Sequence, residues 1–162
     1  MDVATEPDGP APVVREVETV RRKAEHLSSR ILDRMRLKGR TSQAGSSIGD
    51  CGDDYDPDTH FSIGHHWSLA HTSEAELERA FDGLPVALPK DGWKVLSVGP
   101  DEHTQARVPT LKAEYVHGED IFTVTIRIQK RWGENDPDDP RLLVSLGSTC
   151  YRVPPGEEVT DY

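Results

Sequence analysis

Within the expected strand at residues 121–130, residues 122–129 alternate strictly between apolar and polar side chains, and this pattern constrains the fold more than any other feature of the sequence. The apolar positions are Phe122, Val124, Ile126 and Ile128, and the polar positions are Thr123, Thr125, Arg127 and Gln129. Successive side chains of a β-strand point to opposite faces of the sheet, so this strand has one face to bury and one that can remain in water. The sequence therefore predicts a sheet that is covered on one side only.

Further segments have the composition or the period of strands, at residues 63–70, 92–98, 111–115 and 142–150. In the first of them, Ile63, His65 and Trp67 share one face. The residues His117-Gly118-Glu119-Asp120 form a hairpin turn between the third and fourth strands. Because short turns join neighbouring antiparallel strands, the last four strands are expected to form a meander.

Two segments carry apolar residues at spacings of three and four, the period of an amphipathic helix. The first extends over about residues 12–38 and stops at Gly39. The second begins at Ser73, where Ser-Glu-Ala-Glu forms a capping box, and ends at Pro85 or Pro89. The expected buried positions are Val13, Val17, Val20, Ala24, Leu27, Ile31 and Met35 in the first helix and Leu77, Ala80, Phe81 and Leu84 in the second.

These elements predict an α+β fold: an antiparallel sheet of four to five strands with two helices on one face, in the order α-β-α-β-β-β-β. Residues 13–152 form the single domain, preceded by a flexible stalk (1–12) that is rich in proline and followed by an acidic, frayed tail (153–162). The core is expected to unite Trp67, Trp93, Phe122, Val124, Ile126, Val144 and Leu146 beneath Leu77, Phe81 and Leu84.

The charge balance restricts the possible partners. The chain has 29 acidic and 19 basic residues and a formal net charge of −10, which disfavours nucleic-acid binding by the domain as a whole. No apolar run approaches the roughly 20 residues of a membrane-spanning helix. The segment 15–40 is the exception to the acidic balance, because it holds nine bases and four acids.

Two interpretations of the basic first helix remain open. In the first, the helix lies on the acidic body of its own domain. In the second, its exposed side faces an anionic membrane or a cell-wall polymer. The candidate surface-binding residues are Arg21, Arg22, Lys23, Arg30 and Arg34.

Cys51 and Cys150 are the two cysteines of the chain. Their settings favour a disulfide, since Cys51 lies in a polar segment rich in Gly and Asp and Cys150 ends the last strand. Two unrelated buried thiols are the alternative. A bridge would enclose 98 residues and would indicate an oxidising, extracytoplasmic compartment.

The order of these features resembles the mature domain of small secreted or lipid-anchored proteins of high-GC actinobacteria. The matching residues lie within residues 15–150 and are Cys51, Trp67, Gly92-Trp93-Lys94-Val95 and Ser148-Thr149-Cys150. The resemblance implies a disulfide and a cell-surface address rather than an activity. No lipobox cysteine precedes the domain in this sequence, so the lipid anchor is an expectation that rests on the resemblance.

The strongest cluster of potential metal ligands is Asp54, Asp56 and Asp58, which have the first three ligand spacings of a calcium loop. Thr59 stands where that loop needs glycine, and His65 stands at its twelfth position, so turn-forming aspartates are favoured over a calcium site. His65 and His66 are adjacent on a strand and point to opposite faces.

No nucleophile elbow, P-loop or dinucleotide fingerprint occurs in the sequence, and no catalytic residue or cofactor is expected. We therefore expect a non-enzymatic, extracytoplasmic binding module that is tethered at the cell surface and recognises a protein partner. Two alternatives remain. One is an acidic, immunity-type inhibitor that blocks a basic partner, and the other is a metal-dependent hydrolase with a dispersed site.

Overall fold

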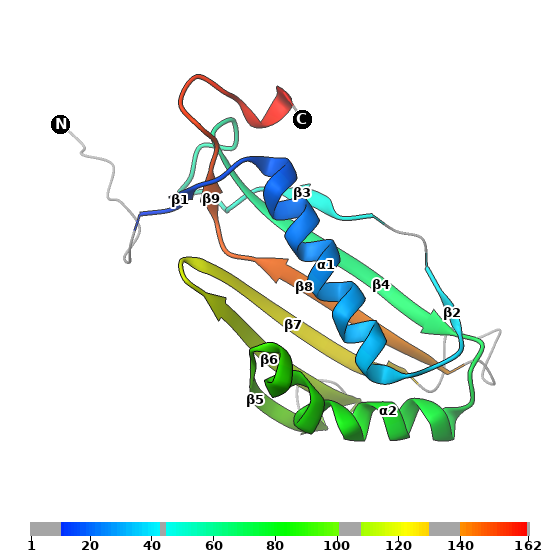
Figure 1. Ribbon diagram of the computed structural model, residues 1–162. Helices are drawn as coiled ribbons and strands as arrows, with labels where there is room; N and C mark the ends of the chain where they lie inside the picture. The colour runs from blue at the N-terminus through cyan, green and yellow to red at the C-terminus, as the bar shows by residue number, and fades with distance from the viewer. Residues whose placement is uncertain (1–10, 43–44, 101–107, 130–139, 162) are drawn as a thin grey trace.

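The computed structural model describes residues 11–42, 45–100, 108–129 and 140–161, which are arranged in two layers. One layer is a β-sheet. The other consists of α1 (Val17–Met35) and α2 (Glu74–Ala87), which lie on the same face of that sheet (Figure 1). The protein is therefore of the α+β class. None of the helices in the described ranges is both long and apolar enough to span a membrane.

Four long strands form the antiparallel meander that the sequence predicts. They are β5 (Trp93–Pro100), β6 (Pro109–His117), β7 (Asp120–Gln129) and β8 (Arg141–Ser148). The hairpin between β6 and β7 turns at Gly118, whose φ of 61° is readily adopted by glycine. The buried side chains of β7 are Phe122, Val124, Ile126 and Ile128, so the predicted facing of this strand is confirmed.

A fifth long strand, β4 (His60–Ala70), pairs with β8 and extends the meander. Short strands complete the sheet and are β1 (Val13–Val14), β2 (Arg40–Thr41), β3 (Ser47–Gly49) and β9 (Tyr151–Arg152). The order along the sheet is β1-β9-β4-β8-β7-β6-β5, with β2 and β3 also paired to β4.

The expected sheet of four to five antiparallel strands is wrong in its size, strand directions and strand order. Within the described residues the sheet has nine strands, and it is mixed because β1 runs parallel to β9. The first long strand along the chain, β4, lies beside the last one, β8. Strands of two or three residues are too short to show an alternating pattern, so only tertiary pairing defines them.

Helix α1 is shorter at both ends than the predicted range of 12–38. Val13 belongs to β1, and the Arg15 backbone N–H donates a hydrogen bond to the Arg152 carbonyl at 2.9 Å, so strand pairing takes the place of the first helical turn. Arg36, and not Gly39, ends the helix in a left-handed conformation with φ 51°. The apolar stripe of α1 from Val17 to Met35 is buried as expected.

Helix α2 begins at the predicted cap, where Ser73 Oγ accepts a hydrogen bond from the Glu76 N–H at 3.2 Å. Its end falls between the two predicted prolines, because Pro85 lies inside the helix and the last helical residue is Ala87. A 3₁₀-helix, η1 (Leu88–Asp91), follows and leads into β5. Gly92 makes this connection with φ 94°, which a residue with a Cβ rarely adopts.

The predicted core is confirmed as one buried cluster, in which α1 packs on β4 and β8 and α2 packs on β7. Residues 153–161, which we expected to be a frayed tail, contain Val153 in this core and a 3₁₀-helix, η2 (Val159–Asp161). The Val159 N–H donates to the Asp58 carbonyl at 2.7 Å. Of the expected stalk at residues 1–12, only residues 11 and 12 lie within the described ranges.

Candidate functional site

The face of the sheet opposite α1 and α2 carries the polar half of each alternating strand. Strand pairing aligns one polar residue from each of the five long strands into a row. This row, called the polar row below, consists of Ser97, Lys112, Thr125, Ser145 and His66. With about 4.8 Å between neighbouring strands, the polar row is roughly 19 Å long. Its side chains are held at fixed spacings by the backbone hydrogen bonds of the sheet.

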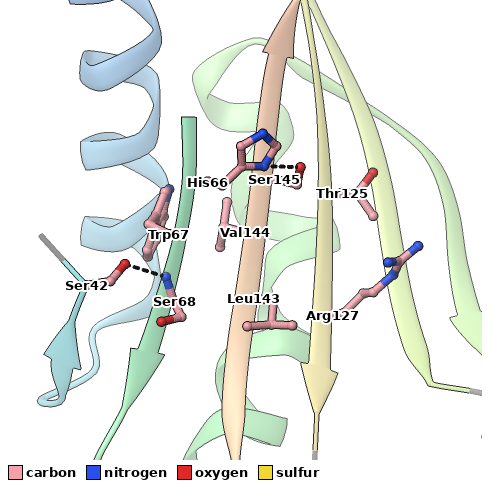
Figure 2. A pocket seen from close by; sticks show the side chains of 9 residues that line it. All are labelled: Ser42, His66, Trp67, Ser68, Thr125, Arg127, Leu143, Val144 and Ser145. Carbon is pink, nitrogen blue, oxygen red and sulfur yellow. Dashed lines mark hydrogen bonds between the residues drawn. The ribbon is translucent and has the colours of Figure 1, made fainter. Parts of the chain in front are cut away.

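A cavity of about 350 Å³ lies on this face, at the β4 end of the polar row (Figure 2). Its walls come from β4, β8, β7 and the residue after β2, and they are Ser42, His66, Trp67, Ser68, Thr125, Arg127, Leu143, Val144 and Ser145. His66 Nδ1 and Ser145 Oγ are hydrogen-bonded at 2.7 Å. Half-buried Leu143 lies between Ser68 and Arg127 on the neighbouring strands.

The charge of this face differs in sign from that of the whole chain. By the alternation of the five long strands, their outward positions carry the bases Lys94, Lys112, Arg127 and Arg141 and the acid Glu114 within the described residues. Lys94 pairs with Glu114 in the register of β5 and β6, whereas Lys112 lies opposite Ser97. The chain as a whole has a formal net charge of −10. This face is called the uncovered face below, because no helix of the described residues lies on it. Among its described residues, bases outnumber acids.

A second polar cluster lies on the other face, between α1 and the strands β3 and β4. Ser46 donates to Glu25 Oε1 through its Oγ at 2.9 Å and through its N–H at 3.3 Å. These hydrogen bonds lower the pKa of Glu25, since they stabilise its carboxylate. His65 Nδ1 is hydrogen-bonded to the buried Ser28 Oγ at 2.7 Å. His65 and His66 thus point to opposite faces, as the sequence predicts.

Cys51 and Cys150 form a disulfide, with their Cα atoms 5.6 Å apart. The bond joins the segment between β3 and β4 to the short connection between β8 and β9. These two segments are far apart in the sequence. The preference for a cysteine pair over two separate thiols is confirmed.

The structure places Asp54, Asp56 and Asp58 in the loop before β4. Asp56 Oδ1 accepts a hydrogen bond from the Asp58 N–H at 2.9 Å, and the Asp56 carbonyl accepts one from the His60 N–H at 2.9 Å. These are the contacts of an aspartate that shapes a turn. Within the described ranges, no group of three or more His, Cys, Asp or Glu side chains is arranged to hold a metal ion.

Most of the candidate bases of α1 have partners inside the protein. Arg30 and Arg34 both donate to Asp91, and Lys23 Nζ lies 5.2 Å from the centre of the Tyr115 ring. Arg21 donates to Glu18 Oε1 at 3.1 Å and to the Ser46 carbonyl at 3.2 Å. Arg22 is exposed. The structure therefore does not gather the five bases into one outward-facing group.

The cavity residues on β7 and β8 were not among the predicted site residues. The residues concerned occupy the outward positions of two alternating strands and are Thr125, Arg127, Leu143 and Ser145. The alternation of apolar and polar residues is the feature of the sequence that identifies them as outward-facing. A sequence pattern identifies such positions as solvent-facing without showing which of them neighbouring strands bring together. No family model, curated protein or solved structure matches the chain.

Proposed function

We propose that this chain is a non-enzymatic, extracytoplasmic binding module that recognises a protein partner through the uncovered face of its sheet. The cavity of about 350 Å³ beside the polar row carries this proposal. It combines hydroxyl and imidazole groups with the apolar side chain of Leu143. Protein interfaces have this arrangement on a larger scale, with an apolar centre inside a polar rim.

The rigidity of the binding face supports recognition. His66, Thr125 and Ser145 project from paired strands, and the His66–Ser145 hydrogen bond fixes two of these side chains relative to each other. Side chains that are ordered before binding lose little conformational entropy when a partner docks. The face can therefore bind a matching surface without prior rearrangement.

The charge of the face indicates the chemistry of the partner. Lys94 and Lys112 are exposed there. A partner that presents acidic groups and hydrogen-bond acceptors to this face would gain complementary electrostatics. The acidic remainder of the domain would disfavour other orientations of the same partner.

The extracytoplasmic part of the proposal rests on the disulfide, because such bonds persist mainly in oxidising compartments. Closing a loop of about 100 residues adds about 4–5 kcal/mol in the chain-entropy model. A small domain exposed outside the cell gains stability from such a bond. In this proposal, the N-terminal segment tethers the domain to the cell surface.

Site-specific photo-crosslinking tests the proposed face. Benzoylphenylalanine is placed at exposed Ser145 on the sheet, at Arg79 on the outer side of α2, or at Arg22 on α1, and intact producing cells are irradiated. The proposal predicts discrete, protease-sensitive adducts from position 145 that disappear when Thr125→Glu is added. Adducts from position 22 alone would instead favour the basic helix as the binding surface, and adducts of equal strength from all three positions would contradict a specific face.

A further inference from the structure

The cavity of about 350 Å³ on the uncovered face has two adjacent rows of outward side chains as its floor (Figure 2). Strand pairing aligns one residue each from β4, β8 and β7 in either row, and the rows are His66, Ser145 and Thr125, then Ser68, Leu143 and Arg127. Leu143 stands in the middle of the second row, directly opposite Ser68 and diagonal to Thr125. The floor therefore has an apolar centre with hydroxyl groups around it.

The hydroxyl of Thr125 is accessible to a molecule in the cavity. Thr125 is half-buried, and its Oγ1 has no hydrogen-bond partner within the described part of the chain. This oxygen is not one of the buried side-chain atoms that lack a partner, so solvent reaches it. Ser145 differs, because its hydroxyl is already hydrogen-bonded to His66 Nδ1. A hydroxyl can donate one hydrogen bond and accept two, so Thr125 can take either role towards a bound group.

The charges of the cavity wall favour a neutral group. Among the described residues that line the cavity, none is Asp or Glu, so a cationic group would find no counter-charge there. Arg127 is the basic residue of the second row, and it already interacts with another group of the protein. A carboxylate would lose part of its hydration in the cavity without gaining an unengaged guanidinium, which is unfavourable.

The size of the cavity and its apolar centre favour an aromatic group. Ligand pockets range from about 300 to 1,000 Å³, so about 350 Å³ is suited to one large side chain rather than to a whole drug-sized molecule. Half-buried Leu143 offers apolar surface to a ring. Diagonal neighbours on paired strands lie about 7–8 Å apart, so a ring on Leu143 can carry a polar group to Thr125. A phenol combines such a ring with a terminal hydroxyl that donates and accepts hydrogen bonds.

We propose that this cavity receives a tyrosine side chain of the protein partner, with the ring on Leu143 and the phenol hydroxyl hydrogen-bonded to Thr125 Oγ1. The inference rests on the proposed function and adds the side chain that anchors the partner. Tyrosine is one of the residues that contribute most to the free energy of binding at protein interfaces. Because its side chain has two rotatable torsions, it loses little conformational entropy when it is ordered.

Titration with N-acetyl-tyrosinamide tests the cavity in the absence of the partner. N-acetyl-phenylalaninamide lacks only the phenol hydroxyl, and N-acetyl-tryptophanamide provides a different aromatic ring with a donor. The tyrosine amide is expected to shift the methyl NMR signals of Leu143 and Thr125 saturably in the millimolar range. The phenylalanine amide should bind about fivefold more weakly, which corresponds to the loss of one neutral hydrogen bond. The tryptophan amide should also bind more weakly than the tyrosine amide.

A pair of matched variants on β7 locates the hydrogen bond. Thr125→Val and Thr123→Val each replace a hydroxyl with a methyl group at an outward position, and of the two only Thr125 lines the cavity. Thr125→Val should remove the preference for the tyrosine amide over the phenylalanine amide, and Thr123→Val should retain it. The proposal is overturned if the tyrosine amide shifts neither methyl signal, if either of the other amides binds as tightly, or if Thr125→Val keeps the preference.

The titration requires no partner, so its outcome is separate from that of the crosslinking test. Adducts from position 145 without binding of the tyrosine amide would overturn the tyrosine anchor and leave the protein-binding face standing. Binding of the amide without adducts from position 145 would overturn the protein-binding face, and with it the assignment of the tyrosine to a partner.

Discussion

Arg34 binds both carboxylate oxygens of Asp91, with Nε to Oδ2 and Nη2 to Oδ1 each at 2.8 Å. Arg30 adds a third hydrogen bond of 2.8 Å to the same carboxylate. The Asp91 side chain is 9% exposed, so this ion pair is partly shielded from solvent. Bidentate hydrogen bonding between a guanidinium and a carboxylate is among the stronger hydrogen-bond arrangements in proteins. It joins the last turns of α1 to η1 and fixes the first helix to the rest of the fold.

The first prediction concerns pH. The hydrogen bonds from Arg34, and then those from Arg30, lower the pKa of Asp91 from 3.8 to about 2. Because the pKa of Asp91 is lower in the folded state than in the unfolded state, its ionised carboxylate stabilises the fold at pH values above the unfolded-state pKa. This stabilisation is lost as the pH falls from about 4 towards 2. The shift corresponds to about 2 kcal/mol. Asp91→Asn should therefore lower the free energy of unfolding by about 1–3 kcal/mol at neutral pH.

Urea denaturation between pH 7 and pH 3 measures this effect, with Asp82→Asn on the exposed side of α2 as the control. The wild type should lose stability relative to Asp91→Asn as the pH falls, whereas Asp82→Asn should follow the wild type. A constant difference between wild type and Asp91→Asn at every pH would contradict the assignment.

The Arg34–Asp91 pair is a long-range contact that local sequence patterns do not predict. The excess of bases between residues 15 and 40 was visible, and so was the alternative that these bases lie on their own domain. The identity of their partner was not, because 57 residues separate Arg34 from Asp91. Contacts at that distance along the chain depend on how the layers pack. Local patterns predicted the α2 cap, the β6–β7 hairpin and the facing of β7, which are all properties of short segments.

The second prediction concerns the disulfide. Replacing both Cys51 and Cys150 with serine should lower the free energy of unfolding by about 2–5 kcal/mol, because the unfolded chain regains the entropy of a loop of roughly 100 residues. Guanidinium denaturation of oxidised wild type, reduced wild type and the double variant provides the comparison. Reduced wild type should match the double variant. Equal stability of all three samples would show that the cross-link does not stabilise the domain.

The third prediction concerns the facing of β7. Phe122 is 1% exposed and contacts the Tyr115 ring in the core, whereas Thr123 is on the uncovered face. Phe122→Ala should destabilise the protein by about 3–5 kcal/mol, and Thr123→Ala should change its stability by about 0.5 kcal/mol or less. The two melting temperatures provide the test. If Thr123→Ala were the more damaging change, the register of the sheet would be incorrect by one residue.

The candidate site was less predictable than the core. The hydrophobic effect imposes a strict alternation on buried positions, so residues such as Phe122 and Val144 were identified from sequence. Outward positions obey no comparable rule, and the sequence gives no reason to group Thr125 with Ser145 and His66. These residues come together because β4, the first long strand along the chain, pairs with β8, the last one, and β8 in turn pairs with β7.

The fourth prediction concerns calcium. Asp56 shapes a turn, so millimolar calcium should leave the melting temperature of the wild type unchanged. Specific binding would instead stabilise the protein by about 2.7 kcal/mol at a hundredfold excess over the dissociation constant. Thermal denaturation with calcium and with a chelator distinguishes the two cases. A calcium-dependent rise in melting temperature that is lost in Asp56→Asn would establish a metal site in this loop.

The central claim is that the uncovered face of the sheet binds a protein partner, and matched charge insertions test it most directly. Ser145→Glu adds a bulky anion to the polar row, and Gly83→Glu adds the same side chain to α2, where a Cβ at Gly83 meets nothing within 4 Å. Calorimetric titration of the partner that crosslinks at position 145 measures both affinities. Ser145→Glu should weaken binding at least tenfold, or about 1.4 kcal/mol, and Gly83→Glu should leave it within about twofold. Equal affinities of the two variants would contradict the proposed face.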